Sequence, residues 1–167
     1  DAEMKESWSA PGDPDALRRE FAEWDPRIGA LLKQVRETFR SALYDREPLS
    51  TWTKGRLTLL GDAAHAMLPH LGQGANQSIE DGMALATILA RADRKTAPAA
   101  LLAYERLRRE RVAQVQRGAR ENGLRYDSAY SDLGLRDAEL TAHAAFRRRL
   151  YDHDVVPEAE ATATMLA

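Results

Sequence analysis

The chain has 167 residues, of which 44% are hydrophobic and 30% are charged, a balance typical of a folded domain with a sizeable core. Its formal net charge of -2 provides no long-range attraction to nucleic acid or to an anionic membrane, and no apolar run approaches the roughly 20 residues that span a bilayer. The absence of cysteine excludes disulfides, thiolate metal sites and cysteine nucleophiles, and it favours a reducing, cytoplasmic location.

Turn residues and short helical patterns alternate over the first part of the chain. The segment 8–14 contains Pro and Gly and is typical of a strand end that enters a turn. Asp13 or Asp15 can cap a helix that continues to about Trp24. Pro26 can open a second helix, one face of which would be apolar.

Two further segments are predicted to be strands. The pattern over residues 38–49 loosens toward a strand and stops at Pro48. The apolar run 56–60 ends abruptly at Gly61 and Asp62, which is typical of a buried strand that enters a loop. The remaining chain supplies few partners for such strands, so we expect an α+β fold that is mostly helical.

Helical patterns dominate the rest of the chain. Apolar residues cover much of the circumference of the helix predicted at 75–91, so this helix should be buried. Pro98 opens a longer helix, after which Gly118, Gly123 and Gly134 predict irregular structure up to a last helix at 137–151. The predicted organisation has four parts: helices and a strand at 1–54, a strand, loop and buried helix at 55–92, helices at 93–156, and a mobile tail at 157–167.

The loop before the buried helix carries the residues best suited to bind a ligand. Asp62 leaves the carboxyl end of the predicted strand, and its carboxylate can accept hydrogen bonds from sugar-like hydroxyls. Gly72 and Gly74 let a flat ring approach the backbone, because no Cβ intervenes. The start of the next helix offers free N–H groups and a partial positive charge, which suit an anion. Each feature alone is common in proteins without a ligand site.

In this order, the residues closely resemble the second flavin-binding motif of the FAD-dependent aromatic-ring monooxygenases, the family of para-hydroxybenzoate and salicylate hydroxylases. That motif runs Gly-Asp-Ala-Ala-His, then Pro, then a Gly-rich turn and a helix, and residues 61–81 contain every landmark. The flanking segments 21–26 and 44–60 also fit, and the resemblance spans residues 8–125. It implies the C-terminal part of an FAD-binding α/β fold of the glutathione reductase type.

The resemblance also implies roles for single residues. Asp62, turned by Gly61, would bind a ribityl hydroxyl of FAD, and Pro69 would lie beside the reactive edge of the isoalloxazine ring. His65 would support the loop, and His70 is a candidate substrate contact, although no residue is assigned a certain catalytic role. The pyrimidine side of the ring would face a helix start that favours negative charge, formed by Gly72, Gln73, Gly74, Ala75 and Asn76.

The family activity implies further partners. With FAD as cofactor, its members use NAD(P)H and O2 to hydroxylate an aromatic, phenol-like small molecule. They begin with a βαβ unit whose Gly-x-Gly-x-x-Gly turn binds the FAD pyrophosphate, and none of the ten glycines here fits that pattern. We therefore expect a C-terminal fragment that lacks this unit and is inactive alone. Its exposed strand edges would pair with the missing N-terminal portion or, in a homo-oligomer, with another copy.

The residues alone leave two other functions open. One is a helical assembly module in which the flavin loop is a relic, and the other is a flavin reductase or carrier without oxygenation. No metal site is expected, because His65 and His70 are five residues apart and no acidic cluster accompanies them.

The arginines of the later helices are interleaved with acidic residues, so solvated helix faces are expected rather than a nucleic-acid surface. These are the arginines at 106, 108, 109, 111 and 147–149. His143 and His153 are likewise expected on the surface.

Overall fold

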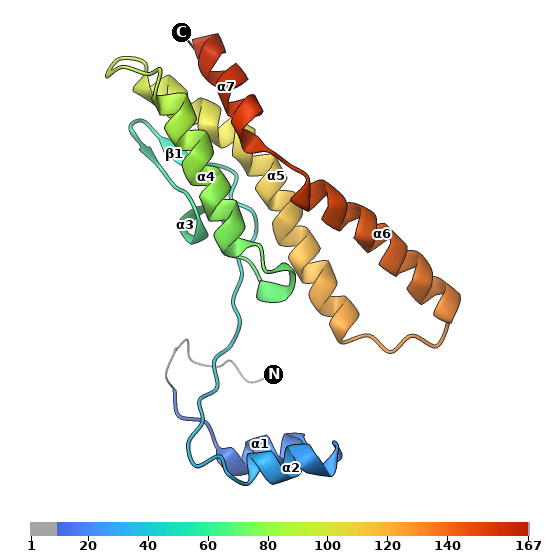
Figure 1. Ribbon diagram of the computed structural model, residues 1–167. Coiled ribbons are helices and arrows are strands. Elements are labelled where there is room, and N and C mark those ends of the chain that lie inside the picture. The colour runs from blue at the N-terminus through green and yellow to red at the C-terminus, as the bar shows by residue number, and fades with distance from the viewer. Residues whose placement is uncertain (1–9, 167) are drawn as a thin grey trace. The chain divides into compact units, whose positions relative to one another are not determined.

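The computed structural model describes residues 10–166, and these fall into two compact units whose boundary in the sequence lies between residues 43 and 44. The first unit contains helices α1 (Pro14–Glu20) and α2 (Pro26–Leu32), each opened by its proline (Figure 1). Asp13 caps α1, because its carboxylate accepts a hydrogen bond of 2.8 Å from the backbone N–H of Asp15. Of the two caps that the sequence allows, the structure therefore uses the earlier one.

The strand predicted at 38–49 does not form. Its only ladder contact in the described part of the chain is an isolated bridge between Pro11 and Phe39, beside a 2.8 Å hydrogen bond from Gly12 N to Thr38 O. Charged residues interrupt the apolar alternation that would bury one face of a strand. The strand end predicted at 8–14 falls partly on residues 8 and 9, which lie outside the described residues.

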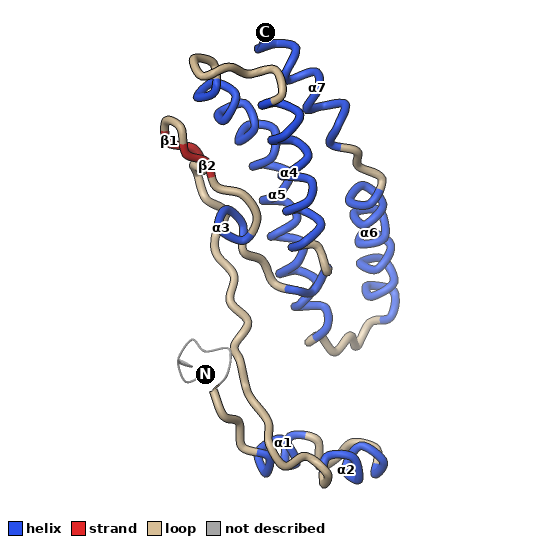
Figure 2. Tube along the Cα trace, turned by 60° about the vertical axis from the view of Figure 1, so that its left-hand side comes forward, coloured by secondary structure: helices blue, strands red, loops and turns tan. Residues whose placement is uncertain are grey.

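The second unit is built around three helices that lie side by side in Figures 1 and 2: α4 (Gly74–Leu89), α5 (Ala97–Tyr126) and α7 (Val155–Leu166). Helix α4 buries one face only, formed by Gln77, Asp81, Ala84 and Ile88. The expected burial around most of the helix is therefore wrong in extent, because Ile79 is 66% exposed. The core that the helices enclose contains Trp52, Ala84, Ile88, Tyr104, Val112 and Ala159.

A small antiparallel hairpin covers one side of α5. Its strands are β1 (Thr53–Lys54) and β2 (Leu57–Thr58), joined through Gly55 at a φ of 63°. The strand predicted at 56–60 is thus much shorter, and it is not buried, since Leu57 is 62% exposed. The described part of the chain is mostly helical, with this one two-stranded sheet.

Helix α5 continues through the two glycines that were expected to end it. A Cβ built on Gly118 would lie 2.6 Å from Cζ of Phe146, and one on Gly123 would overlap Nδ1 of His70. These glycines therefore mark close packing against the helix rather than breaks in it. Tertiary contact has overridden the weak helix propensity of glycine.

Two Gly→Ala substitutions should separate these effects. Gly82 lies in α4 with nothing within 4 Å of its Cβ position, so G82A should stabilise the 167-residue chain by about 0.5–1 kcal/mol through helix propensity. G123A gains the same propensity, but it must displace the His70 ring, and overpacking costs roughly 1–3 kcal/mol. Chemical denaturation should therefore rank G82A above G123A in unfolding free energy, and equal values would contradict the close packing at Gly123.

The described C-terminal residues form helices, and residues 157–166 of the tail predicted to be mobile lie in one of them. Asp132 caps α6 (Leu133–Tyr151) by accepting hydrogen bonds from the backbone N–H groups of Gly134 and Leu135. Helix α7 then packs on α4 and α5 through small residues, which allow the helices to approach closely. None of the described helices is both long and apolar enough to cross a membrane.

The packing of α7 predicts that an alanine-to-leucine substitution changes the unfolding free energy by an amount that depends on its position in the helix. Ala159 is fully buried, whereas Ala161, two residues further along the same helix, is exposed. A159L should lower the unfolding free energy by about 1–3 kcal/mol because it overpacks the interface, and A161L should change it by less than about 0.5 kcal/mol. Thermal unfolding of both variants would check this, and two unchanged melting temperatures would mean that α7 does not dock.

Candidate functional site

The Gly61–Asp62 turn places a carboxylate beside the start of α4. Gly61 has a φ of 59°, and Asp62 begins the short helix α3 (Asp62–His65). The Asp62 side chain is exposed, and its Oδ1 lies 3.9 Å from the point where a Cβ on Gly74 would be. Two of the residues predicted for the site are thus brought together, and Gly74 leaves the space between them open.

The start of α4 has unused hydrogen-bond donors. A 3₁₀ turn, η1 (Pro69–Leu71), leads through Gly72 at a φ of 63° to the helix. Gln73 occupies the N-cap position, but its buried side chain makes no capping hydrogen bond. Ala75 and Asn76 in the first turn are exposed. The N–H groups of this turn therefore have no side-chain cap, and they favour an anion or a ring with negative charge.

Behind the loop lies a buried polar cluster centred on Asp81. Its Oδ2 lies 2.6 Å from Nε2 of His65 and accepts a hydrogen bond of 3.0 Å from Gly61 N, while Arg108 Nε donates to its Oδ1 at 2.8 Å. Burial would raise the pKa of Asp81, but hydrogen bonds from His65, Gly61 and Arg108 outweigh it and hold the pKa below its usual value. The carboxylate is therefore ionised at neutral pH. His65 supports the loop as predicted.

Arg108 corrects the prediction of a solvated arginine face. Its side chain is fully buried and also donates to Glu80 Oε2 at 2.6 Å and to Gln77 Oε1 at 2.9 Å. Burial would raise the pKa of Glu80, but Arg111 and Arg108 together lower it. A signal for this cluster exists in the sequence, because Asp81 and Arg108 each fall on the apolar stripe of their helix.

His143 and His153 are less exposed than predicted, whereas the candidate substrate contact of His70 stays a prediction. The His70 ring packs edge-on against Tyr126, with centroids 5.8 Å apart, and its Nδ1 lies 3.3 Å from Ala119 O. His143 is half-buried, and burial together with nearby Arg125 lowers its pKa. His153 is also half-buried, and its Nε2 lies 3.8 Å from Oε2 of Glu80. Within residues 10–166 no cluster of potential ligands could hold a metal ion.

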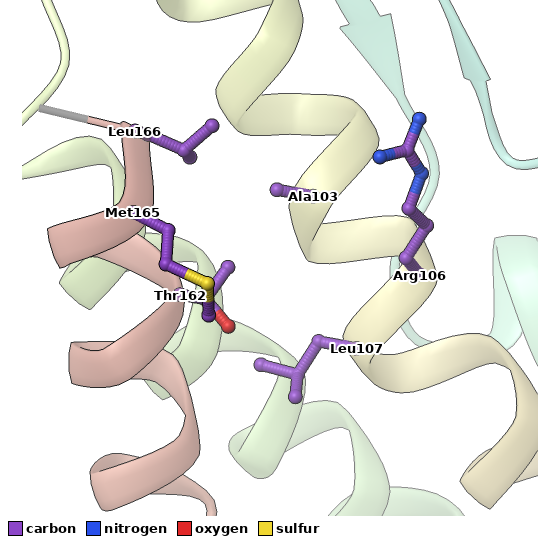
Figure 3. Close-up of a pocket in the computed structure, with 6 residues that line it drawn as sticks. All are labelled: Ala103, Arg106, Leu107, Thr162, Met165 and Leu166. Atoms are coloured by element: carbon purple, nitrogen blue, oxygen red, sulfur yellow. The ribbon is translucent and has the colours of Figure 1, made fainter.

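A surface hollow lies elsewhere, between α5 and α7 (Figure 3). Its volume is about 380 Å³, and mostly apolar side chains line it: Ala103, Arg106, Leu107, Thr162, Met165 and Leu166. None of these belongs to the 61–76 loop, so the loop and α4 remain the candidate site.

Comparison with known proteins identifies the family of the chain. Residues 21–119 match the family described as FAD binding domain. The chain is 47% identical to a 3-amino-4-hydroxybenzoate 2-monooxygenase of Streptomyces platensis, over 71% of this chain and 30% of that protein. It is 37% identical to a salicylate hydroxylase of Pseudomonas putida, over 98% of this chain and 40% of that protein.

Solved structures agree with the sequence comparisons. A salicylate hydroxylase substrate complex superimposes with a TM-score of 0.79 at 33% identity, covering 98% of this chain and 40% of that one. CtdE in complex with FAD superimposes with a TM-score of 0.71 at 26% identity, covering 99% of this chain and 39% of that one.

The chain belongs to the FAD binding domain family, and FAD is the cofactor of that family. Within the family it is related to the aromatic-ring monooxygenases, of which it spans 30–40% of the length. The site fits part of this cofactor: the exposed Asp62 carboxylate suits hydroxyl groups, and the uncapped start of α4 suits a ring that gains negative charge.

Proposed function

We propose that the whole protein is an FAD-dependent monooxygenase that hydroxylates an aromatic, phenol-like substrate with NAD(P)H and O2. In this proposal residues 1–167 are its C-terminal part, and they bind the ribityl and isoalloxazine portion of FAD. The observation that carries the proposal is the exposed Asp62 carboxylate beside the uncapped start of α4. The family and its named relatives support the same activity.

Each residue of the loop has a defined task in this proposal. Asp62 accepts hydrogen bonds from ribityl hydroxyls, and Gly61 allows its turn. Pro69 is exposed at the start of η1, where it borders the reactive edge of the ring and helps to exclude water. The first turn of α4 stabilises negative charge by fixed dipoles rather than by proton transfer. The loop and helix start that face the pyrimidine side of the ring consist of Gly72, Gln73, Gly74, Ala75 and Asn76. Bound FAD supplies the redox chemistry.

The proposal also assigns a partner to the chain. The dinucleotide-binding βαβ unit of the family has no counterpart in the described residues, and apolar side chains stand exposed on α4 and the hairpin, including Ile79 at 66% and Leu57 at 62%. In this proposal these apolar side chains are covered by another part of the protein. We assign it to an N-terminal portion of the protein, with a homo-oligomer as the alternative. In this view, residues 1–167 alone bind FAD weakly and do not turn over.

A helical assembly module with a relic loop has less support. It predicts a loop from Ala63 to Gln73 without defined structure, whereas this loop contains α3 and η1 and is tied to α5. Asn122 Nδ2, for example, donates a hydrogen bond of 2.7 Å to His70 O.

The first experiment is a visible absorption spectrum of the purified protein after mixing with FAD and desalting. The whole protein should retain the flavin and oxidise NAD(P)H faster when a phenolic substrate is added. NAD(P)H oxidation that no phenol stimulates would favour a flavin reductase or carrier. A whole protein that remains colourless would refute the proposed function, after an intact mass has verified its length.

A further inference from the structure

The short helix α3 cannot fix its own geometry. It has four residues, far fewer than an isolated helix needs, and its N-cap, Gly61, has no side chain with which to cap it. Nevertheless it begins with Asp62, whose direction decides whether a ligand can use the carboxylate. The geometry of this turn must therefore be imposed by neighbouring groups.

Asp81 holds both ends of that turn with a single oxygen. Its Oδ2 accepts a hydrogen bond of 3.0 Å from Gly61 N, before Asp62, and lies 2.6 Å from Nε2 of His65, the last residue of α3. A second residue of α4 also approaches the turn closely, because a Cβ on Gly61 would lie 3.0 Å from Ser78 Oγ. The path of the chain from 61 to 65 is thus defined by α4.

Arg108 fixes Asp81 in turn. The guanidinium contacts three residues in one stretch of α4, donating from Nε to Asp81 (2.8 Å), from Nη1 to Glu80 (2.6 Å) and from Nη2 to Gln77 (2.9 Å). The side chains of both Arg108 and Asp81 are fully buried. A buried ion pair often contributes no more stability than a packed apolar pair would, and in some proteins such pairs specify geometry instead.

We infer that Asp81 and Arg108 are positioning residues for FAD, which hold the Gly61–His65 turn so that the Asp62 carboxylate faces the start of α4. This inference rests on the proposed function, in which Asp62 binds the ribityl chain. Neither side chain touches the flavin, because both are buried behind the loop. Their effect is transmitted through the backbone of Gly61 and the imidazole of His65.

The test is D81N in the whole protein, with E105Q as a matched control. Asparagine keeps the shape of aspartate, but it presents an N–H group where one of the three donors now lies. Glu105 is also a buried carboxylate, but it accepts a hydrogen bond of 2.8 Å from Thr53 N on the hairpin and does not contact the turn. Both variants remove one buried charge, and only in D81N does the lost charge contact the turn.

Two measurements separate positioning from general stability. In the absence of FAD, D81N should speed hydrogen exchange of the Ala64 and His65 amides, which donate to Gly61 O at 2.9 Å, and E105Q should leave it unchanged. The dissociation constant for FAD should rise about 10- to 100-fold in D81N, the range seen when hydrogen bonds that orient metal ligands are lost, and less than about threefold in E105Q.

A folded D81N protein with wild-type exchange at residues 64–65 and wild-type FAD affinity would overturn the inference, as would equal effects in E105Q. Should D81N fail to fold, R108K supplies the same test, because a single ammonium cannot contact Gln77, Glu80 and Asp81 at once. Failure of the proposed function is distinguishable, because the wild-type protein itself would then not bind FAD, while the exchange at residues 64–65 would still report on the turn.

Discussion

Replacing Arg108 with methionine is expected to lower the unfolding free energy by roughly 3–5 kcal/mol, the cost of breaking a buried ion pair from one side. Methionine fills most of the volume, but it leaves the Asp81 carboxylate buried without its partner and removes one of two arginines from Glu80. R117M is the matched control, because Arg117 is half-exposed on the same helix and pairs with the exposed Glu110. It should cost less than about 1 kcal/mol in urea denaturation.

The same pair predicts how stability depends on pH. The pKa of Asp81 is lowered in the folded protein, so its contribution is complete above the unfolded pKa of about 3.9 and is lost as pH falls through the folded pKa. In R108M the carboxylate loses a group that lowers its pKa, and acid then protonates it more readily. The stability difference between wild type and R108M should therefore be largest near neutral pH and shrink below about pH 4. A difference that is constant between pH 7 and pH 3 would contradict this assignment.

The sequence predicts the local elements of the fold better than their extents. Spacing of apolar residues correctly predicts α4, and Pro26 correctly marks the start of α2. The continuation of α5 through Gly118 and Gly123 was missed, because the local signal for a glycine break is the same as that for a glycine packed under a side chain. Only the placement of Phe146 and His70 decides between them.

The site shows the same division between local and tertiary information. The motif around Asp62 can be read from adjacent residues, since its parts lie within about twenty positions of one another. Arg108 lies 27 positions beyond Asp81, among other charged residues of which Arg106 and Glu110 do face solvent. Composition alone therefore favours a solvated face. Only the position of Arg108 between Tyr104 and Val112, on the buried stripe of α5, indicates that it is buried and needs a partner such as Asp81.

Asp62→Ala is expected to weaken FAD binding by roughly 10- to 100-fold, since a hydrogen bond to a charged group contributes about 1.5–3 kcal/mol and each 1.4 kcal/mol corresponds to a factor of ten. The side chain is exposed, so removing it should change the unfolding free energy by no more than about 0.5 kcal/mol. Loss of affinity without loss of stability is the expected pattern, measured by flavin fluorescence titration of the whole protein and by urea denaturation.

Two companions make the Asp62 result specific. D62N keeps one acceptor oxygen and should lose less affinity than D62A, because a neutral acceptor still binds a hydroxyl. D152N changes an exposed aspartate at the end of α6 and should leave FAD binding unchanged. If D62A bound FAD as tightly as the wild type, the carboxylate would not face the ribityl chain, and the cofactor would depend on the α4 helix start and on the N-terminal portion of the protein instead.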